Sequence, residues 1–508
     1  MLPELQQSRE RIPEITASSE TGNGRPSPYE KQFKWLELVL FVYFGLRLIY
    51  FAVTISPHVP PDEVTHFGVS TIFSTAFLLP DNSPASYQYG LVTNIPWLYY
   101  WIMGKLLHFN FFGAPDLVFL RILNIPFAFA TVYFVRRLAT LITDDTIVRL
   151  LVVVAMTNTL MFSFVSASVS YDNLTNLLAA MSFYYLTAFF KNRSAGSLAI
   201  SIICVLAGCL TKITFLPLVP LFALLFVVRE AKNIGSLILA LVAFFKAPGR
   251  LGTVLLVGIF AGLILNFQLY GGNYLTYKAI QPTVEGVLPL ENAMQYRLTA
   301  RGIILKQFRE GHISLDQAHE MASRISHPGD RQDTLTLIDN YAYRQQAGFK
   351  PIGPLPYTAL WILHMLSTSF GIKAHIGMPN HGLSFIPLAV LVLFVIAGFV
   401  VRWRPWDMAW LPTSLIGISI CYAAFLIVRI NYAAYLDSTD IVMSVAGRYI
   451  FPVMGPVYVV SCLYLLRLFK GEKMRVGLAV FAALVLIFSD FPFFLAKVTP
   501  EWYAWASL

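Results

Sequence analysis

One short run of residues in this sequence combines two carboxylates with an imidazole. It is Pro60-Pro61-Asp62-Glu63-Val64-Thr65-His66-Phe67, and it directly follows an apolar stretch of membrane length. Ionisable groups at the edge of a membrane bundle are costly unless they are solvated or paired, so the run is a hypothesis for a functional site. A carboxylate here could accept the proton of a substrate hydroxyl. The structural alternative is that Asp62 caps a helix beginning at Glu63, with both charges at the positive end of that helix.

Three further polar groups follow along the chain. Asp172, in Ser-Tyr-Asp-Asn, lies between two apolar segments and could orient an acceptor, bind a cation or cap a helix beginning at Asn173. Lys212, in Leu-Thr-Lys-Ile, lies near the end of another apolar segment, where its ammonium either reaches water or faces a phosphate. Arg448, followed by Tyr449, offers a planar fork for phosphate oxygens; alternatively it anchors a helix to lipid headgroups.

The composition determines the class of protein. Of the 508 residues, 56% are hydrophobic and only 13% are charged, which is more apolar surface than a soluble domain can bury. We therefore expect an all-α polytopic membrane protein. The formal net charge of +9 does not indicate nucleic-acid binding, because most cations flank apolar segments. Neither a Walker-type motif nor a strand-linked GxGxxG occurs, which argues against a soluble nucleotide as donor.

About eleven apolar segments are long enough to cross a membrane, and two more raise the upper limit to about thirteen. The eleven segments are 35–54, 118–138, 147–167, 173–190, 197–213, 214–229, 251–269, 383–401, 408–428, 449–467 and 476–495. If residues 1–34 form a disordered cytoplasmic tail, every end predicted to be cytoplasmic carries Lys or Arg, for example Arg136 and Arg137. The run at Asp62 then lies on the extracytoplasmic side.

Those two additional segments, and one shorter segment, are better explained as helices on the membrane surface. Tyr87–Phe109 and Tyr357–Ile372 are rich in Trp and Tyr, which favour the headgroup level, and we expect them on the outer surface. Admitting one of them alone as a span would invert the charge pattern of every later segment. Gly235–Phe245 is expected on the inner surface.

The spans divide the chain into regions. Residues 35–270 form an N-terminal membrane module with a first outer loop at 55–117, and residues 381–508 form the C-terminal membrane helices. Between them, residues 271–380 are the only sizeable water-soluble insert. Helical spacing in that insert predicts a small extracytoplasmic cap. The predicted cap helices are Glu291–Glu310, Ser314–Ile325 and Thr334–Gln346.

The first predicted cap helix carries a series of arginines. Arg297, Arg301 and Arg309 recur along it and could hold an acceptor. The structural alternative is an ordinary solvated helix face.

Taken together, these motifs resemble a known family. The diproline-Asp-Glu-x-x-His-Phe run, a second span ending in Arg-Arg, the Tyr-Asp-Asn hinge, the Leu-Thr-Lys element and Gly447-Arg448-Tyr449-x-x-Pro452 look like a bacterial membrane family. That family is related to the lipid-dependent glycosyltransferases of superfamily C (GT-C). The resemblance covers about residues 35–495. It implies a GT-C-like bundle in the inner membrane with its active site outside, and an acidic residue of the first outer loop as base; Asp62 matches that position.

The resemblance also implies substrates. These are a polyprenyl-phosphate-linked sugar donor, bound between spans among membrane lipids, and a glycan or glycolipid acceptor of the cell envelope. Some relatives hold a divalent cation with further acidic residues, and only Glu63 and Asp172 are obvious candidates in this chain. Metal dependence therefore stays open, and no other cofactor is expected.

The resulting expectation is a membrane glycosyltransferase with Asp62 as general base and Arg448 holding the donor phosphate. The residues expected at the site are Asp62, Glu63 and His66 for catalysis, Arg448, Tyr449 and Lys212 for the donor phosphate, and Asp172 and Arg297 for the acceptor. Two other classes stay open. A lipid or sugar transporter or flippase would move its substrate without covalent change, and an oligosaccharide polymerase or ligase would rely more on the arginines of the large loop.

Overall fold

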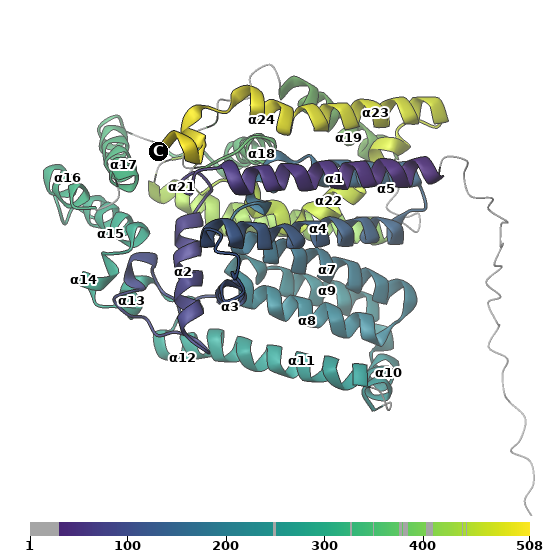
Figure 1. Ribbon diagram of the computed structural model, residues 1–508, viewed down its shortest axis with the longest axis horizontal. Coiled ribbons are helices and arrows are strands. Elements are labelled where there is room, and N and C mark those ends of the chain that lie inside the picture. Colours follow the sequence, from purple (N-terminus) through teal and green to yellow (C-terminus); the bar gives the residue numbers. More distant parts are fainter. Residues whose placement is uncertain are drawn as a thin grey trace, which may run out of the picture.

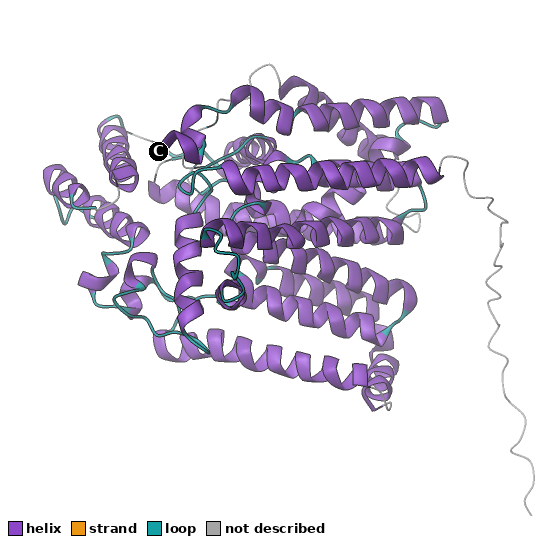
Figure 2. Ribbon diagram, viewed as in Figure 1, coloured by secondary structure: helices purple, strands orange, loops and turns teal. Residues whose placement is uncertain are grey.

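The protein is a helical bundle with a smaller helical cap at one end. The computed structural model describes residues 30–246, 250–325, 328–348, 350–374, 378, 385–402, 410–438, 440–442 and 444–507. Every regular element in these ranges is a helix, which confirms the expected all-α class (Figure 2). Within the same ranges, seven helices are long and apolar enough to cross a membrane, and a pair bent by 61° would make an eighth. The chain is therefore an integral membrane protein.

Each predicted span coincides with helical structure, but the count of about eleven is not confirmed. The helices are α1 (Glu30–Thr54), α4 (Asp116–Ile142), the bent pair α5 (Thr146–Thr157) and α6 (Leu160–Ser166), α7 (Tyr171–Asn192), α8 (Ala195–Thr211), α9 (Leu218–Glu230), α11 (Arg250–Asn266), α19 (Ile386–Arg402), α20 (Trp410–Phe425), α22 (Phe451–Arg467) and α23 (Glu472–Phe488). The helices α8 and α19 have 17 residues each. A helix of that length rises about 25 Å, short of a hydrocarbon core of about 30 Å.

The predicted boundaries differ from the structure at a few places. Residues 1–29 of the predicted tail lie outside the described part of the chain, and α1 already begins at Glu30, so Glu30–Lys34 are helical and not tail. Residues 383–384 and 408–409 of two predicted spans also lie outside the described ranges. Helix α7 is missing from the seven spans because its first two turns carry buried polar side chains, including Asp172.

Most of the long helices run side by side, as Figure 1 shows for α1, α4, α7, α8 and α11. Helix α7 packs against both α4 and α8, and α22 packs against α4, α5, α7, α19 and α20. In the candidate span that contains α22, 72% of the most apolar stretch is buried inside the protein, a larger share than in any other candidate span of the described residues. The chain's last Arg-Tyr-x-x-Pro motif thus enters the centre of the bundle.

Shorter helices lie across the ends of this bundle. In Figure 1, α2 (Glu63–Thr75) and α3 (Leu98–Leu107) cross one end, and α10 (Ile234–Lys246) crosses the other. Helix α18 (Pro354–Phe370) is also viewed nearly along its axis and so runs across the long helices. The sequence predicts surface helices at the segments that contain α3, α10 and α18, but it does not predict one at α2.

The cap lies beyond α2 and is helical as predicted, but two of its predicted helices have other bounds. The predicted helix Glu291–Glu310 is divided into two helices, and the one predicted at Thr334–Gln346 already begins at Pro328. The cap contains α13 (Val284–Val287), α14 (Leu290–Ala293), α15 (Arg297–Arg309), α16 (Leu315–Ser323) and α17 (Pro328–Gln346). Helix α16 begins where Ser314 and Gln317 form a capping box, which satisfies two backbone N–H groups. A separate apolar core holds α15, α16 and α17 together through Ala300, Ile304, Ala318, Ala322 and Ile338.

Candidate active site

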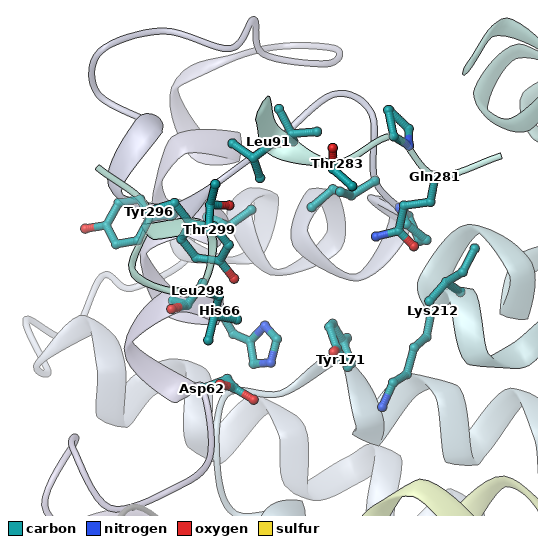
Figure 3. A pocket seen from close by; sticks show the side chains of 18 of the residues that line it. Asp62, His66, Leu91, Tyr171, Lys212, Gln281, Thr283, Tyr296, Leu298 and Thr299 are labelled. Carbon is teal, nitrogen blue, oxygen red and sulfur yellow. The ribbon is translucent and has the colours of Figure 1, made fainter. Parts of the chain in front are cut away.

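A cavity of about 690 Å³ lies between the membrane bundle and the cap. The side chains on its bundle wall include Asp62, Thr65, His66, Tyr100, Tyr171, Lys212 and Tyr449. The side chains on its cap wall include Gln281, Thr283, Glu285, Tyr296, Thr299 and Lys306. In Figure 3, Asp62 and His66 lie on one side of the cavity and Lys212 lies on the other, with Tyr171 between them. The volume is in the range typical of sites for small molecules.

Asp62 joins the cap to the bundle. Its Oδ1 accepts a hydrogen bond from Nη2 of Arg297 at 2.9 Å, and its Oδ2 accepts one from Nη2 of Arg448 at 2.7 Å. The backbone of Asp62 has φ 58° and ψ 11°, a left-handed conformation that an Asp tolerates better than most residues. Asp62 occupies the N-cap position of α2, but its side chain makes no capping hydrogen bond. The capping alternative therefore does not explain this carboxylate.

Cations determine the charge state of Asp62. Burial acts to raise the pKa of its carboxyl, but the Arg448 guanidinium and the further cations around it hold that pKa well below its usual range. The carboxylate is thus ionised at any physiological pH. The same attraction makes it a weak base as long as both arginines stay in contact with it.

Behind the cavity wall, the ionised groups alternate in sign. Arg448 lies between Asp62 and Asp172, with its Nη1 at 3.6 Å from Oδ2 of Asp172. The ammonium of Lys212 contacts Oδ1 of Asp172 at 2.5 Å and lies over the rings of Tyr171 and Tyr449, at 4.6 Å and 5.0 Å from their centroids. Three cations, counting Arg297, thus surround two carboxylates. Arg297 also pairs with a third carboxylate, Asp330, at 2.7 Å, so the cations and carboxylates of the cluster balance.

The backbone explains how Arg448 reaches this position. It belongs to a 3-10 turn, Gly447–Ile450, at the start of α22. A Cβ on Gly447 would lie 2.6 Å from the backbone nitrogen of Ser369 in α18, so only glycine fits. The Gly447 N–H donates to Oγ1 of Thr368 at 2.8 Å. Gly447 thus holds the turn that carries Arg448 directly against α18.

His66 is a neutral group in the cavity wall. Burial lowers the pKa of its imidazole to about 4, although the Asp62 carboxylate opposes the shift. Its Nδ1 is 2.8 Å from the hydroxyl of Tyr100, while its buried Nε2 has no hydrogen-bond partner among the described residues. A buried polar atom without a partner is uncommon and is normally satisfied by water or a ligand. A substrate hydroxyl is a suitable partner for Nε2.

The charge states of Asp62 and His66 predict the pH dependence. Neither group titrates between about pH 5.5 and 8 in the protein without ligand, so kcat/KM for a reaction that uses these groups should be nearly constant across that range. Stability behaves differently, because the unfolded chain protonates its histidine near pH 6.5 and the folded chain only near 4. The folded state should therefore lose stability as the pH falls from 6.5 toward 4. Thermal unfolding measured from pH 4 to 8 should show this loss, and His66→Asn should reduce it.

Glu63 does not line the cavity. Its carboxylate forms a buried two-point pair with Arg121 of α4, in which Nε of Arg121 donates to Oε1 at 2.8 Å and Nη2 donates to Oε2. Oε1 also accepts from the backbone nitrogen of Val169 at 2.8 Å. Adjacent residues in sequence thus have different surroundings, and Glu63 can act on the site only by positioning it.

The structure therefore sorts the eight predicted site residues into three positions. Asp62, His66, Lys212 and Tyr449 line the cavity. Arg448, Asp172 and Arg297 lie one layer behind, each paired with a charged group. Glu63 lies outside, with Arg121. The terminal nitrogens of Arg448 face the carboxylates of Asp62 and Asp172, and its predicted role toward a phosphate stays a prediction.

Several lining residues were missed from the sequence. Tyr100 belongs to the aromatic run Trp97–Trp101, which was interpreted only as a membrane-surface segment. Lys306 lies on α15 and shares a helical face with Thr299, Gly302 and Ile303. That spacing of three to four residues was a usable signal.

The candidate carboxylates do not fit a divalent cation. Within the described residues there is no group of three or more His, Cys, Asp or Glu side chains placed to hold a metal. Glu63 faces Arg121, and Asp172 faces Lys212 and Arg448, so cations already occupy the positions a metal would need. We therefore derive no catalytic step through a metal.

Comparison with known proteins gives similarity of fold only. ArnT from Cupriavidus metallidurans in the apo state shares 13% sequence identity with a TM-score of 0.37, over 86% of this chain and 78% of that chain. The same protein bound to undecaprenyl phosphate shares 12% sequence identity with a TM-score of 0.34, over 86% of this chain and 77% of that chain. An Archaeoglobus fulgidus oligosaccharyltransferase tethered with an acceptor peptide shares 12% sequence identity with a TM-score of 0.42, over 91% of this chain and 56% of that chain.

Sequence comparisons find less. No family model matches the chain, and no curated protein matches it. Because the TM-scores lie below 0.5, no residue role or substrate is transferred from the structurally similar proteins.

Proposed function

We propose that this chain is a membrane glycosyltransferase that moves a sugar from a polyprenyl-phosphate-linked donor to an acceptor hydroxyl in the cavity under the cap. One observation carries the proposal. Asp62, just after the first span, and Arg448, at the start of the buried helix α22, are in contact at 2.7 Å beside a cavity whose opposite wall presents Lys212 (Figure 3). A base and a site for a leaving phosphate are thereby brought together.

The reaction needs a proton acceptor and a cation. The acceptor oxygen forms a bond to the anomeric carbon of the sugar, and the bond from that carbon to the phosphate oxygen breaks. The acceptor's proton moves to Asp62, and polyprenyl phosphate leaves with the electron pair. Lys212 lines the cavity and is the cation that we assign to the phosphate.

Arg448 gives a way to couple donor binding to base strength. Its guanidinium depresses the pKa of Asp62 in the resting protein. A donor phosphate that binds at Lys212 and draws part of the Arg448 charge to itself would weaken that effect, and the basicity of Asp62 would rise. The base would then become effective only with the donor in place.

The remaining lining suits a sugar and its acceptor. Five tyrosines face the cavity: Tyr89, Tyr100, Tyr171, Tyr296 and Tyr449. A tyrosine combines an apolar ring face with a hydrogen-bonding hydroxyl, which matches the mixed surface of a sugar ring. The cap wall adds uncharged hydrogen-bonding groups at Gln281, Thr283 and Thr299. We place the acceptor on this cap side, on the extracytoplasmic face of the membrane.

The orientation is part of the proposal. The Lys- and Arg-rich helix ends, such as the end of α4 at Arg136 and Arg137, lie at the end of the bundle away from the cap (Figure 1). Positive charge marks the cytoplasmic ends of membrane helices. The cap and the cavity then face the outside, where glycans of the cell envelope are built.

Gly302 offers a steric test of the cavity. It lies in α15 and lines the cavity, and a Cβ at this position would have no heavy atom within 4 Å. Gly302→Phe should fill the cavity and lower kcat/KM by about 10²-fold, because misplaced reactants lose the geometry of attack. Gly302→Ala is the matched control: it should keep activity and stabilise the cap helix by about 0.5–1 kcal/mol. Equal activity of both variants would place the reaction elsewhere.

The function itself is tested with purified protein. Polyprenyl-phosphate sugars and candidate acceptors are incubated with the protein, and released polyprenyl phosphate is measured. The proposal predicts its release in equal amount with the glycosylated acceptor. A transporter in proteoliposomes would instead move the intact donor across the membrane and release no polyprenyl phosphate, which would overturn the proposal.

A further inference from the structure

The end of the bundle away from the cap holds a second cavity. Its volume is about 330 Å³, and it lies where α1 and α5 begin and α4 approaches its end. Three cationic side chains line it: Lys34 from α1, Arg136 from α4 and Arg149 from α5. One carboxylate, Glu37, is also present, so the lining has an excess of positive charge.

Both arginines are held in place by contacts on one side. Nη2 of Arg136 donates to Oε2 of Glu37 at 3.0 Å, and its Nε contacts Oε1 of the same carboxylate. Nε and Nη2 of Arg149 donate to the carbonyl of Thr143 at 2.9 Å and 2.7 Å, and Nη2 also donates to Oδ1 of Asp144 at 2.9 Å. These contacts use the Nε and Nη2 edge of each guanidinium. Their side chains remain 33% and 26% exposed, so part of each guanidinium is accessible. Asp144 is fully exposed and its charge is screened by water.

We propose that this cavity binds a phosphate-bearing anion, namely the headgroup of an anionic phospholipid. Guanidinium groups pair with phosphate oxygens through two parallel hydrogen bonds, and the cavity presents two of them beside an ammonium. Phe33 and Leu150 add apolar surface against which the start of an acyl chain can lie. Basic pockets between helices on the cytoplasmic side of a membrane are suited to acidic headgroups. This site is independent of the chemistry proposed for the cap side.

The test compares lipids with free phosphate. The purified protein in neutral detergent is mixed with phosphatidylglycerol, phosphatidylcholine or inorganic phosphate, and bound lipid is counted by native mass spectrometry beside thermal unfolding. We expect phosphatidylglycerol to bind and to raise the unfolding temperature, and phosphatidylcholine not to. Arg149→Gln and Lys34→Gln should each weaken phosphatidylglycerol binding by about fivefold.

A matched control lies on the same helix. Arg137 follows Arg136 directly but does not line the cavity; its Nη2 donates to the hydroxyl of Tyr184 at 3.2 Å. Arg137→Gln removes the same charge and should leave lipid binding unchanged. Inorganic phosphate that stabilises the protein with the same dependence on Arg149 and Lys34 would support the anion site and assign it to a soluble phosphate. An equal loss of phosphatidylglycerol binding in the Arg137 and Arg149 variants, or equal binding of phosphatidylglycerol and phosphatidylcholine, would overturn the proposal. If Arg149→Gln does not fold, Lys34→Gln provides the same test.

Discussion

Replacing Asp62 with asparagine is expected to lower the rate of sugar transfer by about 10²–10⁴-fold, the contribution typical of a positioned general base. The amide keeps the shape of the side chain but cannot take the acceptor's proton. The fold should survive the change because no cation loses its last partner: Arg297 keeps Asp330 at 2.7 Å, and Arg448 keeps Asp172 at 3.6 Å. The measurement is the release of polyprenyl phosphate by wild-type and variant proteins whose unfolding temperatures agree.

Asp330→Asn is the matched control for this experiment. Asp330 contacts the same arginine from α17 but does not line the cavity. Its amide variant should therefore retain most of the activity. A normal rate in the Asp62 variant would remove this carboxylate from the mechanism, whereas an equal loss in both variants would assign the effect to Arg297.

The meeting of Asp62 and Arg448 is the part of the site that the sequence predicted best. The two residues are 386 positions apart in the sequence. Counting the spans between them, with the Lys- and Arg-rich ends inside, predicts both on the same side of the membrane. Membrane topology restricts each polar motif to one of two surfaces, so few arrangements remain. The same argument predicts Asp172 and Lys212 on that side too, but not the direct ion pair that the structure has between them.

The layering of these groups was not predictable from one sequence. Whether Arg448 faces the cavity or a carboxylate depends on the rotation of the Gly447–Ile450 turn, which its contact with Ser369 of α18 fixes. The apolar pattern gives the length of a helix but not this rotation. The same limit applies to α15, where helical spacing offers several faces and the docking of the cap selects the one with Gly302 and Lys306.

Glu63 shows how neighbours in sequence can mislead. The left-handed backbone at Asp62 and the start of α2 immediately after it send the two carboxylates to different partners. Arg121 is the clearest sign of this in the sequence, because a charged residue within the predicted span 118–138 is costly unless it has a partner. Its partner was the nearest buried carboxylate.

The second large effect is expected at this buried pair. Arg121→Met should destabilise the protein by about 3–5 kcal/mol, because it leaves the Glu63 carboxylate buried without a counter-charge. Both side chains are almost fully buried, at 2% and 0% exposure. Unfolding of purified variants in detergent measures the loss. Arg324→Met, which breaks the exposed pair with Glu320, is the control and should have no measurable effect.

The expected result follows from what Arg121 holds together. Besides Glu63, its Nη1 donates to the carbonyls of Ala52 and Ile55 at 3.1 Å and 2.7 Å, which fixes the end of α1 before the loop that carries Asp62. Through Glu63 it also reaches Val169, before Asp172. The double variant Arg121→Met with Glu63→Gln removes both charges and should recover much of the stability, since a neutral pair has no uncompensated charge. No recovery in the double variant, or a small loss in the single one, would show that the ion pair does not hold the site.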